Sequence, residues 1–289
     1  MADFFKLTKM GIIIYVILGG LIGFGLSFPP HATIEFEALF LLIAGLYFLS
    51  AGTFAINQAQ EKHIDEKMPR TKIRPIPRGK ITPLGAYIMG ALFVTIGFIA
   101  LFAITPLTAY IGLLTVILYN GFYTLYWKKK WAFAAVPGAI PGALPIVIGF
   151  SVNSSHIFSP HCVYAFMIMF LWQMPHFWSL AIHFKEDYRL GGIPVLPVAL
   201  GVEKTLYHIG LYTFVYLALA IASPWFVKAN VFYLLLVVPL VFKVFYEFVK
   251  YYAADAQKYW LRFFMWTNLS MLIFLASPLL DRWIYLYMM

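Results

Sequence analysis

One stretch of this chain places oxygen-bearing side chains at regular helical intervals. Asn57, Glu61 and Asp65 are four residues apart, so on a helix they drift by only about 80° and share one face. Mg²⁺ prefers oxygen ligands, and it is usually held by one or two carboxylates together with the phosphates of a substrate. The spacing therefore predicts a magnesium–diphosphate site on this segment.

A basic segment follows these acids, after Pro69 has ended the helix. It could neutralise the remaining phosphate oxygens, since guanidinium groups suit bidentate contacts, and it consists of Arg70, Lys72, Arg74, Arg78 and Lys80. An ordinary membrane-flanking loop also explains lysines and arginines. It does not explain two acids and an asparagine in helical register at the edge of an apolar segment.

A second polar stripe lies on one side of an otherwise apolar helix. Its members alternate at three- and four-residue spacing: Gln173, His176, Leu180, His183 and Asp187. Ionisable groups in a membrane span are costly and usually face a cavity or a partner. We expect Asp187, His183 and Lys185 to bind substrate or metal, whereas for His176 a packing role stays an alternative.

Two further groups could border the same site. Tyr119, Asn120 and Tyr123 lie near the end of a predicted helix, just before three lysines, although tyrosines at such positions are usually membrane anchors. The glycines and prolines of 137–145 indicate either close helix packing or the wall of a groove for a flat or long ligand.

The elements that carry these residues must cross a membrane. The chain of 289 residues is 62% hydrophobic and only 11% charged, whereas a soluble domain has about 25% charged residues. With a single cysteine, Cys162, it can form no internal disulfide. We predict an all-α polytopic membrane protein with one domain over residues 1–289. The absence of a signal or transit pattern in the first residues favours a bacterial plasma (inner) membrane over an organelle.

The apolar pattern predicts nine transmembrane helices, each needing about 20 residues: 11–28, 36–58, 83–104, 107–127, 132–152, 162–183, 205–225, 229–249 and 261–280. Pro106 divides one long uncharged stretch into two of them. With nine helices, all lysines and arginines except Lys228 and Arg282 fall on one side. The positive-inside rule then predicts a cytoplasmic N-terminus, an external C-terminus and acids at the cytoplasmic side. It also explains the net charge of +9 without nucleic acid.

The two acidic segments resemble those of the UbiA-type intramembrane prenyltransferases. The matching stretches are 57–75, 138–145, 172–178 and 187–198, in the family's helix order. The stretches 172–178 and 193–198 are similar to the branch of the family that farnesylates haem. Two positions depart from the family pattern, because Glu61 and His63 stand where aspartates are usual. His183 likewise replaces the first aspartate of the second motif.

The resemblance implies a UbiA-type helical bundle that transfers a farnesyl group from farnesyl diphosphate to a vinyl group of haem B. It implies Mg²⁺ bound by Glu61, Asp65 and Asp187, with Asn57 beside them. Phosphate contacts would come from Arg70, Lys72 and Arg74, and a contact with the porphyrin or its iron from His176. The lipid bilayer and a downstream haem A synthase are the further partners it implies.

Three other functions compete with this interpretation. A prenyltransferase of the same family that acts on an aromatic or quinone precursor would share both acidic segments. A transporter tends to place charges and broken helices at the bilayer midplane, whereas here the acids lie at one end of the helices. A purely structural membrane subunit explains neither segment.

Overall fold

The computed structural model describes residues 2–30, 32–225, 227, 229–253 and 256–288. Within these residues the chain is helical without strands, as predicted. Lys228, one of the two cations predicted on the external side, lies outside them. Nine segments run through the bundle: α2 (Met10–Ser27), α3 (Phe36–Gln60), α5 (Pro83–Ile104), α6 (Pro106–Val116) with its continuation η1 (Ile117–Trp127) and α7 (Lys128–Lys130), α8 (Ala135–Phe150), α9 (Pro160–His183), α12 (Val202–Ala222), α13 (Val231–Ala253) and α14 (Ala256–Met288).

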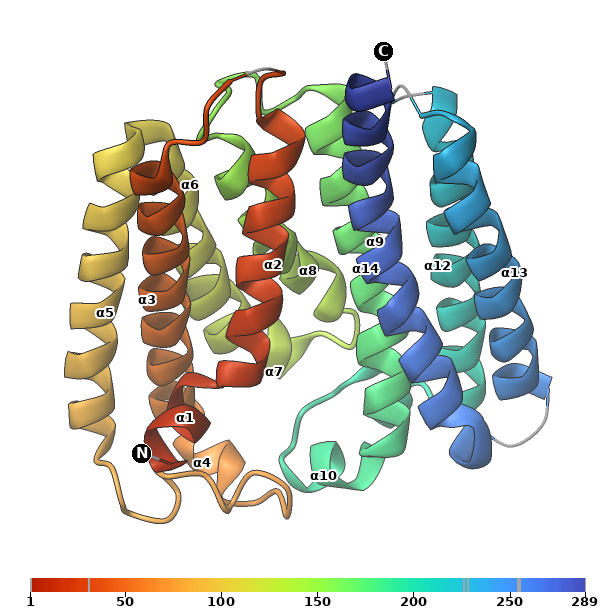
Figure 1. Ribbon diagram of the computed structural model, residues 1–289. Helices are drawn as coiled ribbons and strands as arrows, with labels where there is room; N and C mark the ends of the chain where they lie inside the picture. The colour runs from red at the N-terminus through yellow and green to blue at the C-terminus, as the bar shows by residue number, and fades with distance from the viewer. Residues whose placement is uncertain (1, 31, 226, 228, 254–255, 289) are drawn as a thin grey trace.

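Short helices occupy the turns between these segments. They are α1 (Ala2–Thr8), α4 (Lys62–Asp65), α10 (Lys185–Leu190), α11 (Leu196–Ala199) and the 3₁₀ turn η2 (Ser223–Trp225). Figure 1 shows α1, α4 and α10 together at one end of the bundle, and the C-terminus at the opposite end. In the same view α2, α8, α9 and α14 lie between α3, α5 and α6 on one side and α12 and α13 on the other.

The predicted order of nine helices is confirmed, with one difference in length. Eight helices in the described part of the chain are long and apolar enough to span a membrane, so the protein is a polytopic membrane protein. The remaining one of the nine segments is α8, which has 16 residues and a length of about 24 Å at a rise of roughly 1.5 Å per residue. It is shorter than the predicted 132–152 because turns occupy both ends of that range.

Local sequence explains where several helices begin. Pro83, Pro106 and Pro160 each stand in the first turn of a helix, where the missing amide hydrogen costs nothing. The preceding Thr82 and Thr105 cap these helices by accepting hydrogen bonds from backbone amides. The predicted break at Pro106 is therefore a proline at the start of a new helix.

Close helix approach brings α8 into the middle of the bundle. A Cβ atom on Gly149 would lie 1.8 Å from the carbonyl oxygen of Gly20, and one on Gly23 would lie 2.0 Å from that of Ile146. Only glycine allows α2 and α8 to touch backbone to backbone at these points. Helix α2 is thereby fixed against α8, and both contribute to the site described next.

The second half of the fourth segment departs from α-helical geometry. Residues 117–127 form the π-helix η1, a rare element that is frequent at functional sites. The hydroxyl of Thr124 donates to the carbonyl oxygen of Tyr119, five residues earlier, at 2.9 Å and accepts a hydrogen bond from Asn57. These contacts stabilise the wider turn, which a hydrophobicity pattern does not reveal.

Candidate functional site

A cavity of about 950 Å³ lies inside the bundle, between α2, α3, η1, α8, α9 and α14. Its size is at the upper end of the roughly 300–1,000 Å³ typical of ligand pockets. Residues from both acidic segments and from the tyrosine group line it together: Glu61, Asp65, Arg70, Arg74, Tyr119, Tyr123 and His176. The fold thus brings together at one cavity residues of the two acidic segments that are more than 100 positions apart along the chain.

The two acids of the first segment are buried and paired with cations. The Lys128 ammonium lies 2.6 Å from Glu61 Oε1, and Nη1 of Arg74 donates to both carboxylate oxygens of Asp65 at 2.9 and 2.7 Å. The acidic side chains are 2% and 0% exposed. Burial opposes the charge of Glu61, but Lys128 and Lys9 outweigh it and hold the pKa of this carboxyl below its ordinary value.

Lys9 reaches the same cavity from the junction between α1 and α2. It is the only residue other than glycine with a positive φ, 53°, in the described part of the chain, and its Nζ donates to Asn57 Oδ1 at 2.9 Å. Burial lowers the pKa of this ammonium to about 7, and Arg74 adds to the effect. The charge on Lys9 therefore depends on what occupies the cavity.

The neighbouring residue of α3 fixes this junction. Gln58 Nε2 donates to the carbonyl oxygens of Lys6 and Leu7, at 2.8 and 2.7 Å, which are the last turn of α1. Such orphan carbonyl groups need partners when a helix end is buried. Asn57 and Gln58 thus hold Lys9 and α1 together, and Asn57 itself acts from behind the cavity wall.

The second acidic segment joins the first through a backbone contact. Oδ2 of Asp187 accepts a hydrogen bond from the backbone N–H of Arg70 at 3.0 Å. The Arg70 guanidinium lies over the rings of Phe184 and Tyr188, at 4.8 and 5.8 Å from their centroids. This contact orders the basic segment against α10 and turns Arg70 toward the cavity.

The remaining predicted residues lie outside the cavity lining. Asn120 donates to the carbonyl oxygen of Thr53, and His183 stacks on Trp260 with 3.9 Å between ring centroids. Lys72 is exposed and Lys185 half-buried. Their roles, like the metal role of Asp187, stay predictions. In the sequence Lys9 and Lys128 count only as membrane-flanking charges, because nothing local distinguishes a lysine that lines a cavity from one that faces solvent.

The groove wall predicted from the glycines and prolines of α8 faces this cavity. Gly138, Pro141, Gly142 and Pro145 line it at i, i+3, i+4 and i+7, a single face of the helix. The Tyr123 ring packs over Gly138 and the Gln173 amide over Gly142, where a Cβ atom would lie 2.6 and 2.1 Å from them. The result is a wall without protruding side chains.

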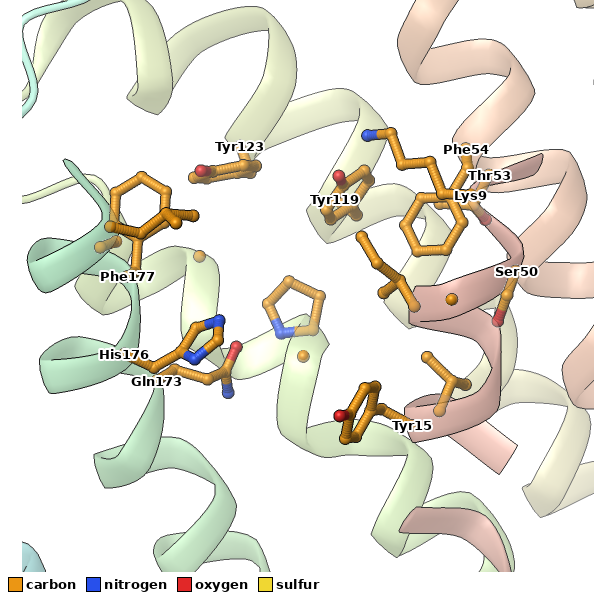
Figure 2. A pocket seen from close by; sticks show the side chains of 18 of the residues that line it. Lys9, Tyr15, Ser50, Thr53, Phe54, Tyr119, Tyr123, Gln173, His176 and Phe177 are labelled. Atoms are coloured by element: carbon orange, nitrogen blue, oxygen red, sulfur yellow. The ribbon is translucent and has the colours of Figure 1, made fainter. Parts of the chain in front are cut away.

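Two sides of the cavity differ in character, as Figure 2 shows. Gln173, His176 and Phe177 lie on one side, and across from them is a group from α2, α3 and the α1–α2 junction: Lys9, Tyr15, Ser50, Thr53 and Phe54. Gln173 is held by hydrogen bonds to the carbonyl oxygens of Ala139 and Met169. The cavity therefore has two differently lined sides beside the α8 wall.

The acidic residues offer oxygen donors to a hard cation. No group of three or more His, Cys, Asp or Glu side chains is arranged as a metal site in the described ranges. Glu61, at the junction of α3 and α4, and Asp65, the last residue of α4, nevertheless line one cavity, although the helix predicted to run to Pro69 is interrupted at Glu61 and ends at Asp65. Mg²⁺ commonly takes only one or two carboxylates and completes its shell with water and substrate phosphates. The donor set fits a cation that binds together with a diphosphate and displaces Lys128 and Arg74 from the acids.

Comparison with known proteins gives a consistent result. A family model described as the UbiA prenyltransferase family matches residues 14–269. A Bdellovibrio bacteriovorus protein named protoheme IX farnesyltransferase is 50% identical over 281 residues, which cover 97% of this chain and 96% of that protein. A Bacillus pumilus protein of the same name is 41% identical over 218 residues, 73% of this chain and 70% of that protein.

Solved structures share the fold at low sequence identity. A structure titled for digeranylgeranylglyceryl phosphate synthase superposes with a TM-score of 0.78 at 18% identity, covering 97% of both chains. A UbiA homologue from Archaeoglobus fulgidus, bound to GPP and Mg²⁺, gives 0.69 at 18% identity, covering 96% of this chain and 99% of that one.

The buried pair of Glu61 and Lys128 makes a prediction about stability. Glu61→Gln leaves the ammonium buried without its anion, so we expect the free energy of unfolding to fall by about 3 kcal/mol or more. Adding Lys128→Met removes the unpaired charge, so the double variant should regain most of the loss. Thermal unfolding of the purified variants in lipid nanodiscs measures the loss in the single variant and the recovery in the double variant.

The exposed pair of Glu186 and Arg189 provides the matched control. Its side chains are 66% and 62% exposed, so Glu186→Gln should leave the unfolding temperature unchanged. If Glu61→Gln unfolds at the same temperature as the parent protein, the Glu61–Lys128 pair does not stabilise the fold, and the interpretation of this contact is wrong.

Proposed function

This chain belongs to the UbiA prenyltransferase family, and from that premise we propose that it transfers a farnesyl group from farnesyl diphosphate to a vinyl group of haem B. The observation that carries the proposal is the 50% identity to a protoheme IX farnesyltransferase over 97% of the chain. The cavity supports it, because it combines a cationic end with apolar walls. Both are needed by a substrate with a diphosphate head and a hydrocarbon tail.

The diphosphate would bind where the cations converge. Lys9, Arg70, Arg74 and Lys128 all line the same cavity, and positive charge in a water-poor site stabilises a leaving anion strongly. Mg²⁺ held by Glu61 and Asp65 would add further positive charge at the same oxygens. A bound diphosphate would also keep Lys9 protonated, since a nearby anion raises the pKa of an ammonium group.

The apolar side across from His176 fits the farnesyl tail. Tyr15, Leu49 and Phe54 line it, and the rings of Tyr119 and Tyr123, whose centroids are 5.6 Å apart, line the same cavity as the cations. Aromatic faces attract positive charge, so these rings can stabilise the allylic cation that forms as diphosphate departs. The apolar lining around it, which includes Leu49 and Phe54, limits its premature capture by water.

The reaction balances with water as third reactant. The C1–O bond of farnesyl diphosphate breaks and its electron pair leaves with diphosphate. The terminal vinyl carbon of haem B forms a bond to C1, which leaves a cation on the carbon next to the porphyrin. Water adds there and releases a proton, giving the hydroxyethylfarnesyl group of haem O. The expected downstream haem A synthase stays a prediction.

Purified protein supplied with farnesyl diphosphate, Mg²⁺ and haem B tests this function. We expect mass spectrometry to show a haem product heavier by one farnesyl group and one hydroxyl group, and EDTA to abolish its formation. Hydroxybenzoate and quinone precursors should remain unmodified. Prenylation of a hydroxybenzoate instead of haem would assign the chain to the alternative, aromatic branch of the family.

Substitutions at Asp65 test the proposed metal contact. Asp65→Asn keeps the size of the side chain but removes its charge, so kcat should fall by at least about 100-fold, or roughly 3 kcal/mol. Asp65→Glu should retain more activity than Asp65→Asn, because it keeps an anionic oxygen. Glu66→Gln, one residue along and 40% exposed, is the control and should remain active. Full turnover by Asp65→Asn with EDTA still inhibitory would place the metal elsewhere.

We propose a plasma-membrane orientation with the cationic end of the cavity toward the cytoplasm. The distribution of lysine and arginine supports it. Reporters fused after Arg78 and after Lys129 should therefore be cytoplasmic, whereas reporters within 153–160 and after Arg282 should be external. A single inverted reporter would contradict the nine-crossing topology.

A further inference from the structure

The cavity stops inside the bundle, at a definite depth below the two acids. On each helix that lines it, one described lining residue lies farthest from the acidic end. These residues are Val16 of α2, Leu49 of α3, Thr115 of α6, Pro145 of α8, Met169 of α9 and Asn268 of α14. Each lies in the interior of its membrane-crossing segment, so the cavity has a floor within the bundle instead of passing through it.

Close packing forms this floor. The side chain of Leu46 of α3, which is 1% exposed, packs directly on Gly20 of α2. One residue earlier, side-chain atoms of Ile146 and Met169 lie 3.6 and 3.7 Å from the position that a Cβ atom on Gly19 would take. Helices α2, α3, α8 and α9 are therefore in van der Waals contact immediately beyond the lining.

The depth of the cavity follows from the helices that line it. Glu61 and Leu49 both line it and are twelve residues apart along α3 and its end, which corresponds to about 18 Å at a rise of roughly 1.5 Å per residue. On the α8 wall, Ala135 and Pro145 are ten residues apart, or about 15 Å. The cavity is thus about 15 to 18 Å deep from its acidic end to its floor.

This depth matches an isoprenoid tail of one particular length. Each isoprene unit adds four carbon–carbon bonds to the main chain, or about 5 Å when bonds of about 1.5 Å are extended in a zigzag. Three units therefore reach about 15 Å, and four units reach about 20 Å. A farnesyl tail fits between the acids and the floor, whereas an extended geranylgeranyl tail is longer than the cavity.

Leu49 separates the cavity from the backbone of α6. Its side chain is 3% exposed and packs against Gly112, where a Cβ atom would lie 3.1 Å from Cδ2 of the leucine. Figure 2 shows this part of α3 at Ser50, the next residue, which lies across the open space from Gln173. Because Gly112 has no side chain, shortening Leu49 would extend the cavity toward α6.

We propose that this floor, and Leu49 in particular, limits the isoprenoid donor to three isoprene units. The inference rests on the proposed function, since it takes the diphosphate of the donor to bind at the acidic end. A tail that fits gains free energy from burial along its whole length, whereas a fourth unit would have to fold back or leave the cavity. Leu49 would then determine specificity for the donor, while the acids and cations would bind donors of every length alike.

Binding of donor analogues to the full-length protein in nanodiscs with Mg²⁺ tests this limit without an acceptor. The probes are the geranyl, farnesyl and geranylgeranyl thiolodiphosphates, in which sulfur replaces the bridging oxygen at C1 and slows ionisation. The parent protein should bind the farnesyl analogue at least about tenfold more tightly than the geranylgeranyl analogue. Leu49→Ala should lose this preference, because it removes three carbons of the floor. Equal affinities in the parent would show that a longer tail leaves the cavity sideways, and would overturn the proposal.

Two further variants separate the floor from general packing. Leu42→Ala is the matched control, because Leu42 is fully buried in the same helix, two turns beyond Leu49 and outside the lining; it should keep the preference of the parent. Val16→Phe should shift the preference toward the geranyl analogue, because the larger side chain shortens the cavity, and it tests the floor even if Leu49→Ala does not fold. A preference that is unchanged in Val16→Phe and Leu49→Ala, or that Leu42→Ala alters equally, would contradict the assignment.

Farnesyl transfer by the parent protein distinguishes this inference from the proposed function. Conversion of haem B by a parent protein that binds the farnesyl and geranylgeranyl analogues equally would refute the length limit and leave the function standing. A preference for the farnesyl analogue that depends on Leu49, without farnesylation of haem B, would refute the function and leave the length limit standing.

Discussion

The cost of placing charge inside an apolar bundle governs the whole site. An unpaired carboxylate or ammonium there would lose most of its hydration without compensation. Glu61 and Lys128, and likewise Asp65 and Arg74, avoid this by pairing at 2.6 to 2.9 Å. The same pairs keep anionic oxygens and cations together in one cavity, where a diphosphate and its metal could exchange partners with them.

Pairing at these distances requires that the helices approach in a fixed arrangement. Small residues provide it, because Gly20, Gly23 and Gly149 allow α2 and α8 to meet backbone to backbone. The cavity face of α8 carries only small residues and prolines, so it forms a flat wall along the cavity. The small residues of α8 therefore allow close helix packing and also leave space for a ligand. The two interpretations of residues 137–145, helix packing and a groove wall, both apply.

The N-terminal residues are part of the site because α3 holds them there. Asn57 binds the Lys9 ammonium, and Gln58 binds the last carbonyl groups of α1. The asparagine that begins the four-residue pattern therefore lies behind the wall and orients a cation, while the two acids after it face the cavity. Asp187 likewise lies outside the cavity lining and contacts a residue that lines it, because its carboxylate accepts a hydrogen bond from the backbone N–H of Arg70.

The sequence by itself determined the helical class, the order of nine helices and the meeting of two acidic segments at one end. Hydrophobic runs, prolines at helix starts and four-residue spacing are local properties, so they can be seen along the chain. Only the tertiary structure decided that Lys9 and Lys128 are the partners of Asn57 and Glu61, and that His176 rather than His183 lines the cavity. Those outcomes depend on the rotation of each helix about its axis and on the wider turn of η1. Contacts between distant helices set both, and no local pattern of residues specifies them.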